Sequence, residues 1–432
     1  MKTYQYTQLT DSDIQKLCQR PRIDFASIFK TVQPILEQVQ NEGDKAIIDL
    51  TEKFDGVRLS ESTTNVDSNT TVALDDEIKN AFDTAYQNIY NFHIAQRPNE
   101  LVVETMPGVL CRREARPIER VGLYVPGGSA ILPSTALMLG VPAKIAGCRE
   151  IVLATPPKKD GTIAPEMLYI AKLIGATCIV KAGGAQAIAA MAYGTESIPK
   201  VDKILGPGNQ YVTAAKMILQ NSEANISIDM PAGPSEVLVI ADKQANPAFV
   251  ASDLLSQAEH GPDSQVVLLS IKSFDTEALE QELEQQLNVL PRVKIAKQSI
   301  GKSYIVEVDT VEEAIRFSNL YAPEHLIINV ENASDYSDNI MNAGSVFLGP
   351  WSPESVGDYA SGTNHTLPTY GYAKIFSGVS LDTFLKFITF QELTDSGLAE
   401  ISGTVMTMAD VEKLHAHKNA VQIRINAIKR NT

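Results

Sequence analysis

The sequence is poor in cysteine and has no long apolar run, and both features exclude classes of protein. Its four cysteines, Cys18, Cys111, Cys148 and Cys178, form no CxxC pair, which indicates free thiols in a reducing compartment. No stretch of 18 or more residues is apolar, so no transmembrane helix is expected. The segment from Met1 to Thr7 lacks the apolar core of a signal peptide. These features predict a cytoplasmic protein.

The sequence is also poor in positive charge. Its 37 basic and 52 acidic residues give a net charge of -15 at pH 7, which argues against nucleic acid or an anionic membrane as a partner, because both bind basic surfaces. The 432 residues exceed the length at which one hydrophobic core keeps growing, so two or more domains are expected. With 44% apolar and 21% charged residues, the composition is that of a globular protein.

Short β-branched runs alternate with helical stretches from Val121 onward. This alternation is typical of a parallel sheet with helices on both faces, and it occurs twice. In the first set, the expected strands are 121–124, 151–154, 178–181 and 201–205, and the expected helices are 134–146, 164–174, 185–192 and 210–218. In the second set, helices separate the expected strands 236–241, 265–269, 304–308, 326–330 and 345–348. The predicted fold class is therefore α/β, with two Rossmann-like parallel-sheet domains that are incomplete and suggest a duplication.

The segments outside these two sets are expected to be an arm, helices and one extended stretch. The polar segment that ends at Pro21 predicts a short N-terminal arm. Helical spacing of apolar residues covers 24–54, with a break at Gly43-Asp44, and about 75–96. Residues 102–113 are expected to be extended around a turn. The tail is helical, and its last helix is expected from Asp410, as N-cap, to Ile428.

One helix carries three groups able to bind a metal or a substrate in its last turn, before Gly261-Pro262 ends it. These groups are Gln257, Glu259 and His260. Gln257 and His260 are three residues apart and share a face, whereas Glu259 points away from Gln257. By ligand chemistry alone, histidine with a carboxylate is a better metal pair than histidine with an amide. A polar helical turn without a ligand is the alternative interpretation.

Two glycine-containing loops follow expected strands and open expected helices. They are Gly183 to Gln186 and Gly206 to Asn209. Ligands of α/β sheets bind beyond the carboxyl ends of the strands, and backbone N–H groups in such loops could cradle a phosphate. No GxGxxG occurs in the chain, so nucleotide binding and ordinary strand-to-helix turns are about equally supported.

Five of the six histidines lie in the second half of the chain. His325 follows Glu324 directly before an apolar strand, and two adjacent bases of different pKa suit staged proton transfer. A polar loop end is the alternative interpretation of this dipeptide.

The long loop over 351–365 carries Asp358 and His365. Loops of this length inside compact α/β proteins are usually functional or disordered. Together with His260, these two side chains would suit a zinc site, although no HxxxH spacing supports one.

The tail contains Glu412, His415 and His417. Glu412 and His415 are three residues apart, which is typical of a surface pair. His417 lies five residues after Glu412, roughly 140° around an ideal helix. A single straight helix would therefore not easily direct Glu412 and His417 at one small ligand, although both could reach a ligand that lies against the flank of the helix.

Eight motifs in this order resemble those of the histidinol dehydrogenase family, and the resemblance covers nearly the whole chain. The motifs are Val121–Gly128, Gly183–Ala187, Gly206–Asn209, Asp229–Glu236, Ser256–Gly261, Pro323–Leu326, Gly357–His365 and Ala416–Lys418.

The resemblance implies a site for one zinc ion per subunit, with the amide of Gln257 rather than the carboxylate of Glu259 as a ligand. The implied zinc ligands are Gln257, His260, Asp358 and His417, and the implied NAD contacts are Tyr124, Gln186 and Asn209. The implied substrate contacts are Ser235, Gln257, His260, His325, Asp358, His365, Glu412 and His417. Catalysis is expected from Glu324 and His325, and His415 matches no functional position of the family.

The implied reaction is the four-electron oxidation of L-histidinol to L-histidine through L-histidinaldehyde, with two NAD consumed and zinc orienting the substrate. The resemblance also implies a homodimer in which the tail of one subunit completes the site of its partner. The rival interpretations are a zinc hydrolase, in which Glu324 activates a metal-bound water, and a protein that binds zinc or imidazole without catalysis.

The expected domains follow from these assignments. They are an N-terminal arm over 1–22, a discontinuous α/β domain over 23–120 and 236–377 with the metal and substrate site, an NAD-binding α/β domain over 121–235, and a helical dimerisation tail over 378–432.

Overall fold

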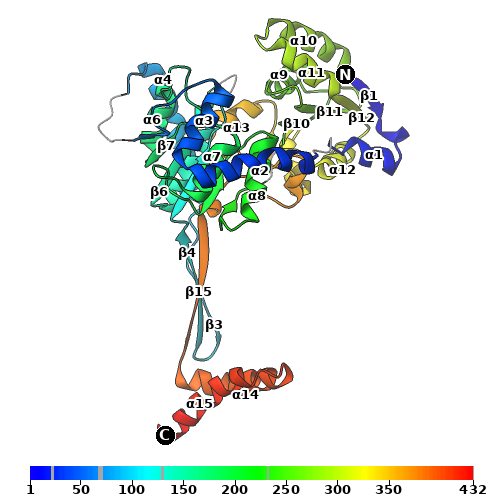
Figure 1. Cartoon of the computed structure of the whole chain (residues 1–432). Coiled ribbons are helices and arrows are strands. Elements are labelled where there is room, and N and C mark those ends of the chain that lie inside the picture. The colour runs from blue at the N-terminus through cyan, green and yellow to red at the C-terminus, as the bar shows by residue number, and fades with distance from the viewer. Residues whose placement is uncertain (21–23, 67–71, 128–130, 231–232, 432) are drawn as a thin grey trace. The chain divides into compact units, whose positions relative to one another are not determined.

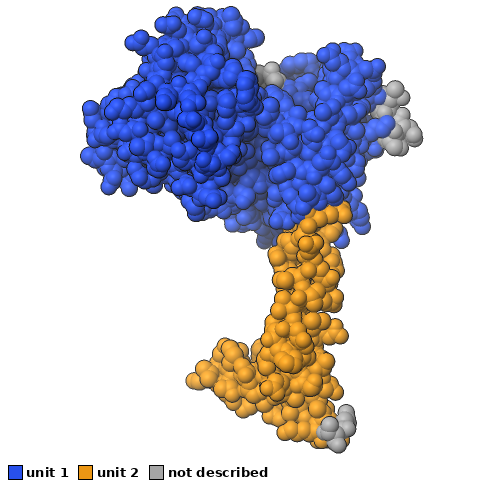
Figure 2. All heavy atoms as spheres, turned by 180° about the vertical axis from the view of Figure 1, so that it is seen from behind, with its two compact units in different colours: residues 1–96, 118–384 blue, residues 97–117, 385–432 orange. Residues whose placement is uncertain are grey.

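The computed structural model describes residues 1–20, 24–66, 72–127, 131–230 and 233–431. The chain forms two compact units, Met1–Gln96 with Ile118–Phe384 and Arg97–Pro117 with Leu385–Thr432, blue and orange in Figure 2. Four positions that the sequence interpretation used, Pro21, Gly128, Pro231 and Ala232, lie outside the described residues. Within the described part of the chain, no helix is both long and apolar enough to cross a membrane.

The first unit contains two six-stranded sheets, and Figure 1 labels β6 and β7 in one of them and β10, β11 and β12 in the other. The strand order of the first of these sheets is β2-β7-β6-β5-β8-β9. All neighbouring strands in it are parallel except β2 and β7. Helices α2, α3, α7 and α8 share one apolar core with this sheet, and α4, α5 and α6 form a separate group against β5 and β6. The strands are β2 (Thr63–Asn65), β5 (Arg120–Tyr124), β6 (Glu150–Ala154), β7 (Cys178–Val180), β8 (Lys203–Leu205) and β9 (Ser227–Ile228). The helices are α2 (Phe25–Glu42), α3 (Asp44–Asp55), α4 (Asp76–Ile94), α5 (Pro133–Ala146), α6 (Pro165–Ile174), α7 (Gly184–Tyr193) and α8 (Gln210–Gln220).

The other sheet of the first unit is fully parallel, with the order β1-β12-β11-β10-β13-β14. Alternate residues of β10 enter opposite cores, because successive side chains of a strand point to opposite faces. Val237 and Val239 lie in the core with α9, α10 and α11, and Leu238 and Ile240 lie in the core with α1 and α12. The strands are β1 (Lys2–Gln5), β10 (Glu236–Ala241), β11 (Gln265–Ile271), β12 (Tyr304–Val308), β13 (His325–Asn329) and β14 (Ser345–Leu348). The helices are α1 (Asp11–Leu17), α9 (Pro247–Ala258), α10 (Thr276–Val289), α11 (Val293–Lys302), α12 (Val311–Tyr321) and α13 (Glu354–Tyr359).

The α/β fold with two parallel sheets is confirmed. Three expected strands, 236–241, 304–308 and 345–348, coincide with β10, β12 and β14. The predicted arm contains β1, which pairs with β12 at the edge of its sheet. The predicted division into four functional domains stays a prediction; in the structure, α2, α3 and β2 pack with the sheet built by residues 120–228.

The second unit is built from a three-stranded antiparallel sheet and two helices. Strand β15 (Leu385–Leu393) pairs along its whole length with β4 (Val109–Pro117), which also pairs with β3 (Leu101–Met106). Helices α14 (Asp395–Val411) and α15 (His415–Asn431) follow. The predicted last helix from Asp410 is wrong, because Lys413 has a φ of 60° and this left-handed conformation ends α14 before α15 begins.

Asp253 generates a prediction about stability, because its carboxyl lies in the buried face of α9 and is 7% exposed. Burial raises the pKa of Asp253 to about 7, above the value of about 3.9 in an unfolded chain. The contribution of Asp253 to folding stability is therefore largest below about pH 4 and falls as the pH rises towards 7, since the unfolded chain releases its proton first. We expect Asp253→Asn to remove this loss and to stabilise the protein at pH 8 by as much as about 4 kcal/mol.

Melting temperatures of both proteins at pH 5 and pH 8 measure this effect. Asp338→Asn, at an exposed position, is the control and should leave the pH dependence unchanged. An equal pH dependence in Asp253→Asn and the wild type would contradict the prediction.

Candidate active site

The Glu324–His325 pair lies at the amino edge of the second parallel sheet. Helix α12 ends at Tyr321, and Ala322 takes a left-handed conformation with a φ of 55° before the chain enters β13 at His325. His325 is in register with Val237 of β10. Glu324 and His325 are both buried, so their charges must be compensated inside the protein.

Neighbouring groups compensate these charges. The backbone N–H of Glu236 donates to Glu324 Oε2 at 2.8 Å, and Glu324 Oε2 lies 3.6 Å from His325 Nδ1. His325 Nε2 lies 3.3 Å from Asp358 Oδ1. Burial alone would lower the pKa of His325, but the carboxylates of Glu324 and Asp358 outweigh it and hold this pKa well above its usual value. Burial raises the pKa of Glu324, and His325 opposes that shift.

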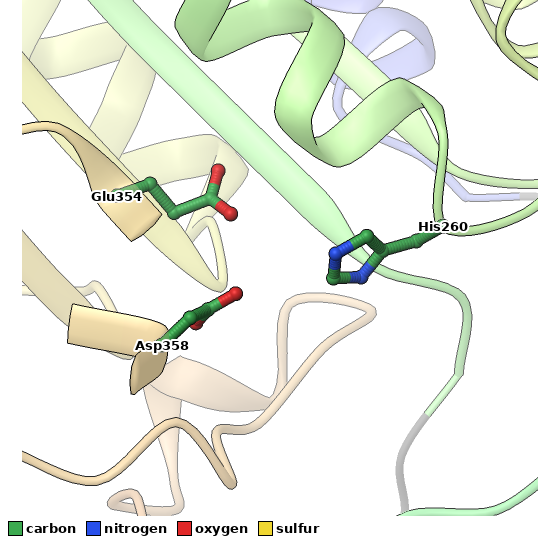
Figure 3. Close-up of side chains that lie close together, drawn as sticks. All are labelled: His260, Glu354 and Asp358. Carbon is green, nitrogen blue, oxygen red and sulfur yellow. The ribbon is translucent and has the colours of Figure 1, made fainter. Parts of the chain in front are cut away.

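A set of metal-binding side chains lies beside this pair. His260, Glu354 and Asp358 each offer a ligand atom, and these atoms lie within 4.8 Å of one another. Figure 3 shows the His260 ring, from the loop after α9, directed towards the two carboxylates of α13. Asp358 has a lowered pKa because His325 donates to it and because neighbouring imidazoles are close, although burial opposes the shift. Nitrogen and carboxylate ligands of this kind suit zinc.

Gln257 contributes an amide to the same region. Its side chain is fully buried in the last turn of α9, and its Nε2 lies 2.9 Å from His325 Nδ1. Its Oε1 is buried and has no hydrogen-bond partner among the described residues. A buried acceptor without a partner is costly, and a bound cation would satisfy it. Glu259, which ligand chemistry alone favoured, is not in the group that could hold a metal ion among the described residues.

Glu354 is a member of this set that the sequence interpretation missed. It is 1% exposed and, like Asp358, belongs to the short helix α13. The signal was present, because Glu354 and Asp358 are four residues apart and so share a helix face. Burial raises the pKa of Glu354 to about 8, so Glu354 is mostly protonated at neutral pH.

A cavity joins the expected substrate residues to one glycine-containing loop. Ser235, Glu324 and His365 line it together with Pro207 and others. His365 Nδ1 donates to the backbone oxygen of Asp358 at 2.8 Å. Ser235 Oγ lies 3.3 Å from His260 Nδ1, so these polar groups surround one space.

The expected cofactor residues follow strands of the first sheet. The backbone N–H of Gly184 donates to the hydroxyl of Tyr124, which ends β5, at 3.0 Å. Asn209 caps α8 and accepts hydrogen bonds from the N–H groups of Tyr211 and Val212. Gln186 is buried in the first turn of α7. All three lie at the carboxyl edge of a parallel sheet, where α/β proteins bind ligands.

A buried ion pair fixes the loop over Gly206 to Asn209. Asp229 accepts the backbone N–H of Gly206 at 2.7 Å, and Lys216 donates to the backbone oxygen of Gly206 at 2.9 Å. Lys216 and Asp229 also pair directly with each other. Gly206 has a φ of 123°, and a Cβ there would overlap the backbone oxygen of Tyr124.

The remaining predicted residues belong to the second unit. Glu412 is the C-cap of α14, and His415 and His417 lie at the start of α15. The break at Lys413 places Glu412 and His417 on different helices, so the constraint of a single straight helix does not apply. The structure groups Ser235, Gln257, His260, Glu324, His325, Asp358 and His365 in the first unit and Glu412 and His417 in the second.

Comparisons with known proteins agree on one family. A family model described as histidinol dehydrogenase matches residues 18–425. The chain is 60% identical to the chloroplastic histidinol dehydrogenase of Arabidopsis thaliana over 430 residues, which cover 99% of this chain and 92% of that protein. It is also 60% identical to the chloroplastic enzyme of Oryza sativa subsp. japonica, with 99% and 91% covered. The crystal structure of histidinol dehydrogenase from Elizabethkingia anophelis has a TM-score of 0.94, 53% identity and 99% of both chains covered.

The comparisons contradict one expectation from the sequence, the cytoplasmic location. Two relatives that are 60% identical to this chain are named chloroplastic. Free thiols indicate a reducing compartment, and that property does not distinguish the cytoplasm from other reducing compartments.

The loop at Gly206 generates a prediction about backbone strain. Gly206→Ala would place a Cβ against the backbone oxygen of Tyr124, so we expect a loss of stability of more than about 2 kcal/mol from overpacking and a left-handed alanine. Gly147→Ala is the matched control, because Gly147 also has a positive φ of 88° but open space around its Cβ; its cost should be about 1 kcal/mol. Denaturant unfolding of both variants measures the difference in stability. Equal midpoints would contradict the prediction, because they would show that the backbone around Gly206 and Tyr124 moves to accommodate a Cβ.

Proposed function

The chain belongs to the histidinol dehydrogenase family, and we propose how its residues carry out the NAD-dependent oxidation of histidinol. The protein is an oxidoreductase of histidine biosynthesis that converts L-histidinol to L-histidine through L-histidinaldehyde. The main support for the residue roles proposed below is that the buried Glu324–His325 pair lies beside side chains that could bind a metal ion.

Gln257, His260 and Asp358 are the zinc ligands that we assign in the first unit, and His417 is the fourth. The orphaned Oε1 of Gln257 supports this set, as does the grouping of His260 with Asp358. Asp358 is preferred to Glu354 because a carboxyl with a pKa of about 8 is mostly neutral and binds a cation weakly. Zinc held by these residues would supply a Lewis-acidic anchor for nitrogen groups of histidinol and would so orient the reacting carbon.

Tyr124, Gln186 and Asn209 are assigned to NAD, within the NAD-binding domain proposed for residues 121–235. The cavity supports this assignment, because Pro207 of the adjacent loop lines it together with Ser235 and Glu324. A cofactor held at this loop would therefore face a substrate held by Ser235, His365 and the metal ligands. NAD accepts a hydride in each of the two oxidations.

His325 takes the proton of the alcohol in the first oxidation. Its Nδ1 lies 2.9 Å from Gln257 Nε2 and 3.3 Å from the backbone oxygen of Glu236, and its Nε2 lies 3.3 Å from Asp358 Oδ1. The carboxylates of Glu324 and Asp358 stabilise the imidazolium that forms. The products of this step are the aldehyde, a hydride on NAD and a proton on His325.

Glu324 takes a proton from the water that attacks the aldehyde. Its Oε2 is held by the N–H of Glu236, so Oε1 is the oxygen that we assign to the water. Burial raises the pKa of Glu324, which makes its carboxylate a stronger base than an exposed one. After His325 has released the first proton to solvent and a second NAD has replaced the reduced one, the hydrate loses a hydride to NAD and a proton to His325, which gives the carboxylic acid.

We propose a homodimer in which the second unit of one subunit supplies Glu412 and His417 to the site of the other. The second unit has few buried apolar residues of its own, and it exposes large apolar side chains, which is typical of a surface that another chain covers. These exposed residues are Leu101, Val102, Val103, Ile388, Leu393, Met408, Val411, Leu414 and Ile423.

Product stoichiometry tests the reaction against its rivals. With limiting L-histidinol and excess NAD, we expect two NADH per histidinol, lost with a chelator and restored by zinc. One NADH per histidinol would contradict the role of Glu324 in hydration. Turnover without NAD would favour a zinc hydrolase, and binding without turnover would favour a binding protein.

Hybrid dimers test the exchange of the tail. His325→Asn and His417→Ala should each be inactive, and His325→Asn should retain its zinc because His325 is not assigned as a ligand. When the two variants are mixed and reassembled at random, half of the dimers are hybrids and each hybrid has one intact site, so about a quarter of the wild-type activity should return. No return of activity, with hybrid formation verified by mass, would show that each tail serves its own subunit.

A further inference from the structure

Arg20 follows α1 in the chain, and its guanidinium group is buried. Its side chain is 5% exposed and that of Glu236 is 2% exposed. Nε and Nη2 of Arg20 donate to the two carboxylate oxygens of Glu236 at 2.9 and 2.8 Å. Nη1 donates to the backbone oxygens of Cys18 and Tyr321 at 2.7 and 2.8 Å. The guanidinium carbon lies 3.4 Å from the centre of the Tyr321 ring, so one group binds three segments of the chain.

Glu236 links Arg20 to the catalytic pair. It is the first residue of β10, and its N–H donates to Glu324 Oε2 while its backbone oxygen lies 3.3 Å from His325 Nδ1. Its carboxylate also accepts the N–H of Tyr370 at 3.0 Å. Glu236 therefore contacts Arg20 through its side chain and the catalytic pair through its backbone.

Tyr321 is the second link. It ends α12, and only Ala322 and Pro323 separate it from Glu324. The hydrogen bond from Arg20 to the backbone oxygen of Tyr321 satisfies one of the carbonyls that a helix end leaves without a partner. Arg20 thus fixes the backbone on both sides of the pair, at the start of β10 and at the end of α12.

We propose that Arg20 is a positioning residue for the oxidation of histidinol, acting through Glu236 and Tyr321 to hold Glu324 and His325 in place. The inference rests on the roles proposed above for Glu324 and His325. Arg20 is absent from the described residues that line the cavity with Ser235 and Glu324, so it is assigned no contact with the substrate. The planar fork of arginine binds two carboxylate oxygens and a carbonyl together, which the single ammonium of lysine cannot do.

The positive charge of Arg20 also affects the Glu324–His325 pair. Burial is the main cause of the raised pKa of Glu324, and the carboxylate of Glu236 adds to it. Arg20 neutralises that carboxylate. Without Arg20, a buried charge next to Glu324 would be uncompensated, and such a charge is costly enough to move the backbone that carries it.

Arg20→Met and Arg20→Lys test the inference in the full-length, zinc-loaded enzyme. We expect kcat to fall by about 10- to 100-fold in Arg20→Met, because small displacements of catalytic groups have effects of this size. Arg20→Lys should recover part of kcat. The KM for NAD should stay within about two-fold and the zinc content should be unchanged, because neither site contacts Arg20.

Arg120→Met is the control for the loss of an arginine–carboxylate pair, at a more exposed position than Arg20. Arg120 also forms a two-point ion pair with a carboxylate, that of Asp202, at the start of β5. All assays are run below the melting temperature measured for each variant. A kcat of Arg20→Met within about two-fold of Arg120→Met overturns the inference, and so does a parallel loss of zinc or of NAD binding. Where Arg20→Met does not fold, wild-type kcat in Arg20→Lys overturns it.

Two further variants separate the possible outcomes. If Arg20 acts through Glu236, the double variant Arg20→Met with Glu236→Gln should lose no more activity than the worse single variant, and additive losses contradict that route.

Glu324→Gln tests the proposed function itself. An inactive Glu324→Gln with an active Arg20→Met overturns only the role of Arg20, whereas an active Glu324→Gln overturns the proposed function and the inference together.

Discussion

The compensation of buried charge is the constraint on which the site depends. Glu324, His325, Glu354 and Asp358 are buried within a few ångströms of one another, and the interior penalises each charge that has no partner. The placement of His325 between the carboxylates of Glu324 and Asp358 satisfies part of this demand, and burial keeps Glu354 mostly neutral. What remains is an excess of acceptors: the carboxylate of Asp358, the imidazole of His260 and the orphaned oxygen of Gln257. A divalent cation would satisfy all three, and this electrostatic demand supports the metal site that we propose.

The proposed cofactor residues and the catalytic pair lie at different edges of their sheets, the first at a carboxyl edge and the second at an amino edge. Tyr124 and Asn209 follow strands and lie at the carboxyl edge of the first sheet, as ligand-binding residues of α/β proteins usually do. Ser235, Glu324 and His325 instead lie where strands of the second sheet begin. An amino edge presents unpaired backbone N–H groups, and that of Glu236 binds the carboxylate of Glu324. The second sheet therefore offers donors for buried carboxylates, whereas the first offers loops for a cofactor.

Much of the fold could be predicted from the sequence, because strands buried on both faces give continuous apolar runs with clear ends. The expected strand 236–241 matches β10, and the break before Asp44 separates α2 from α3. The site was less predictable, since the four-residue spacing of Glu354 and Asp358 indicates a shared site only when α13 is known to face His260. The tail break at Lys413 was missed because a lysine carries no turn signal, and its positive φ depends on tertiary context. The ion pair of Arg20 with Glu236 joins residues 216 positions apart, and no local pattern encodes such a contact.

Ligand chemistry alone favours Glu259 as the metal partner of His260, and the surroundings of Gln257 give a physical reason to propose Gln257 instead. A carboxylate at position 257 would add another buried negative charge beside Asp358 and Glu354, where burial already raises the pKa of Glu354 to about 8. It would also lack a donor for His325 Nδ1, which the amide nitrogen of Gln257 meets at 2.9 Å. The amide thus offers an oxygen to a cation and a hydrogen to a base without changing the charge of the site. The preference for glutamine is a property of the whole buried group, and it appears only when the charges of that group are counted together.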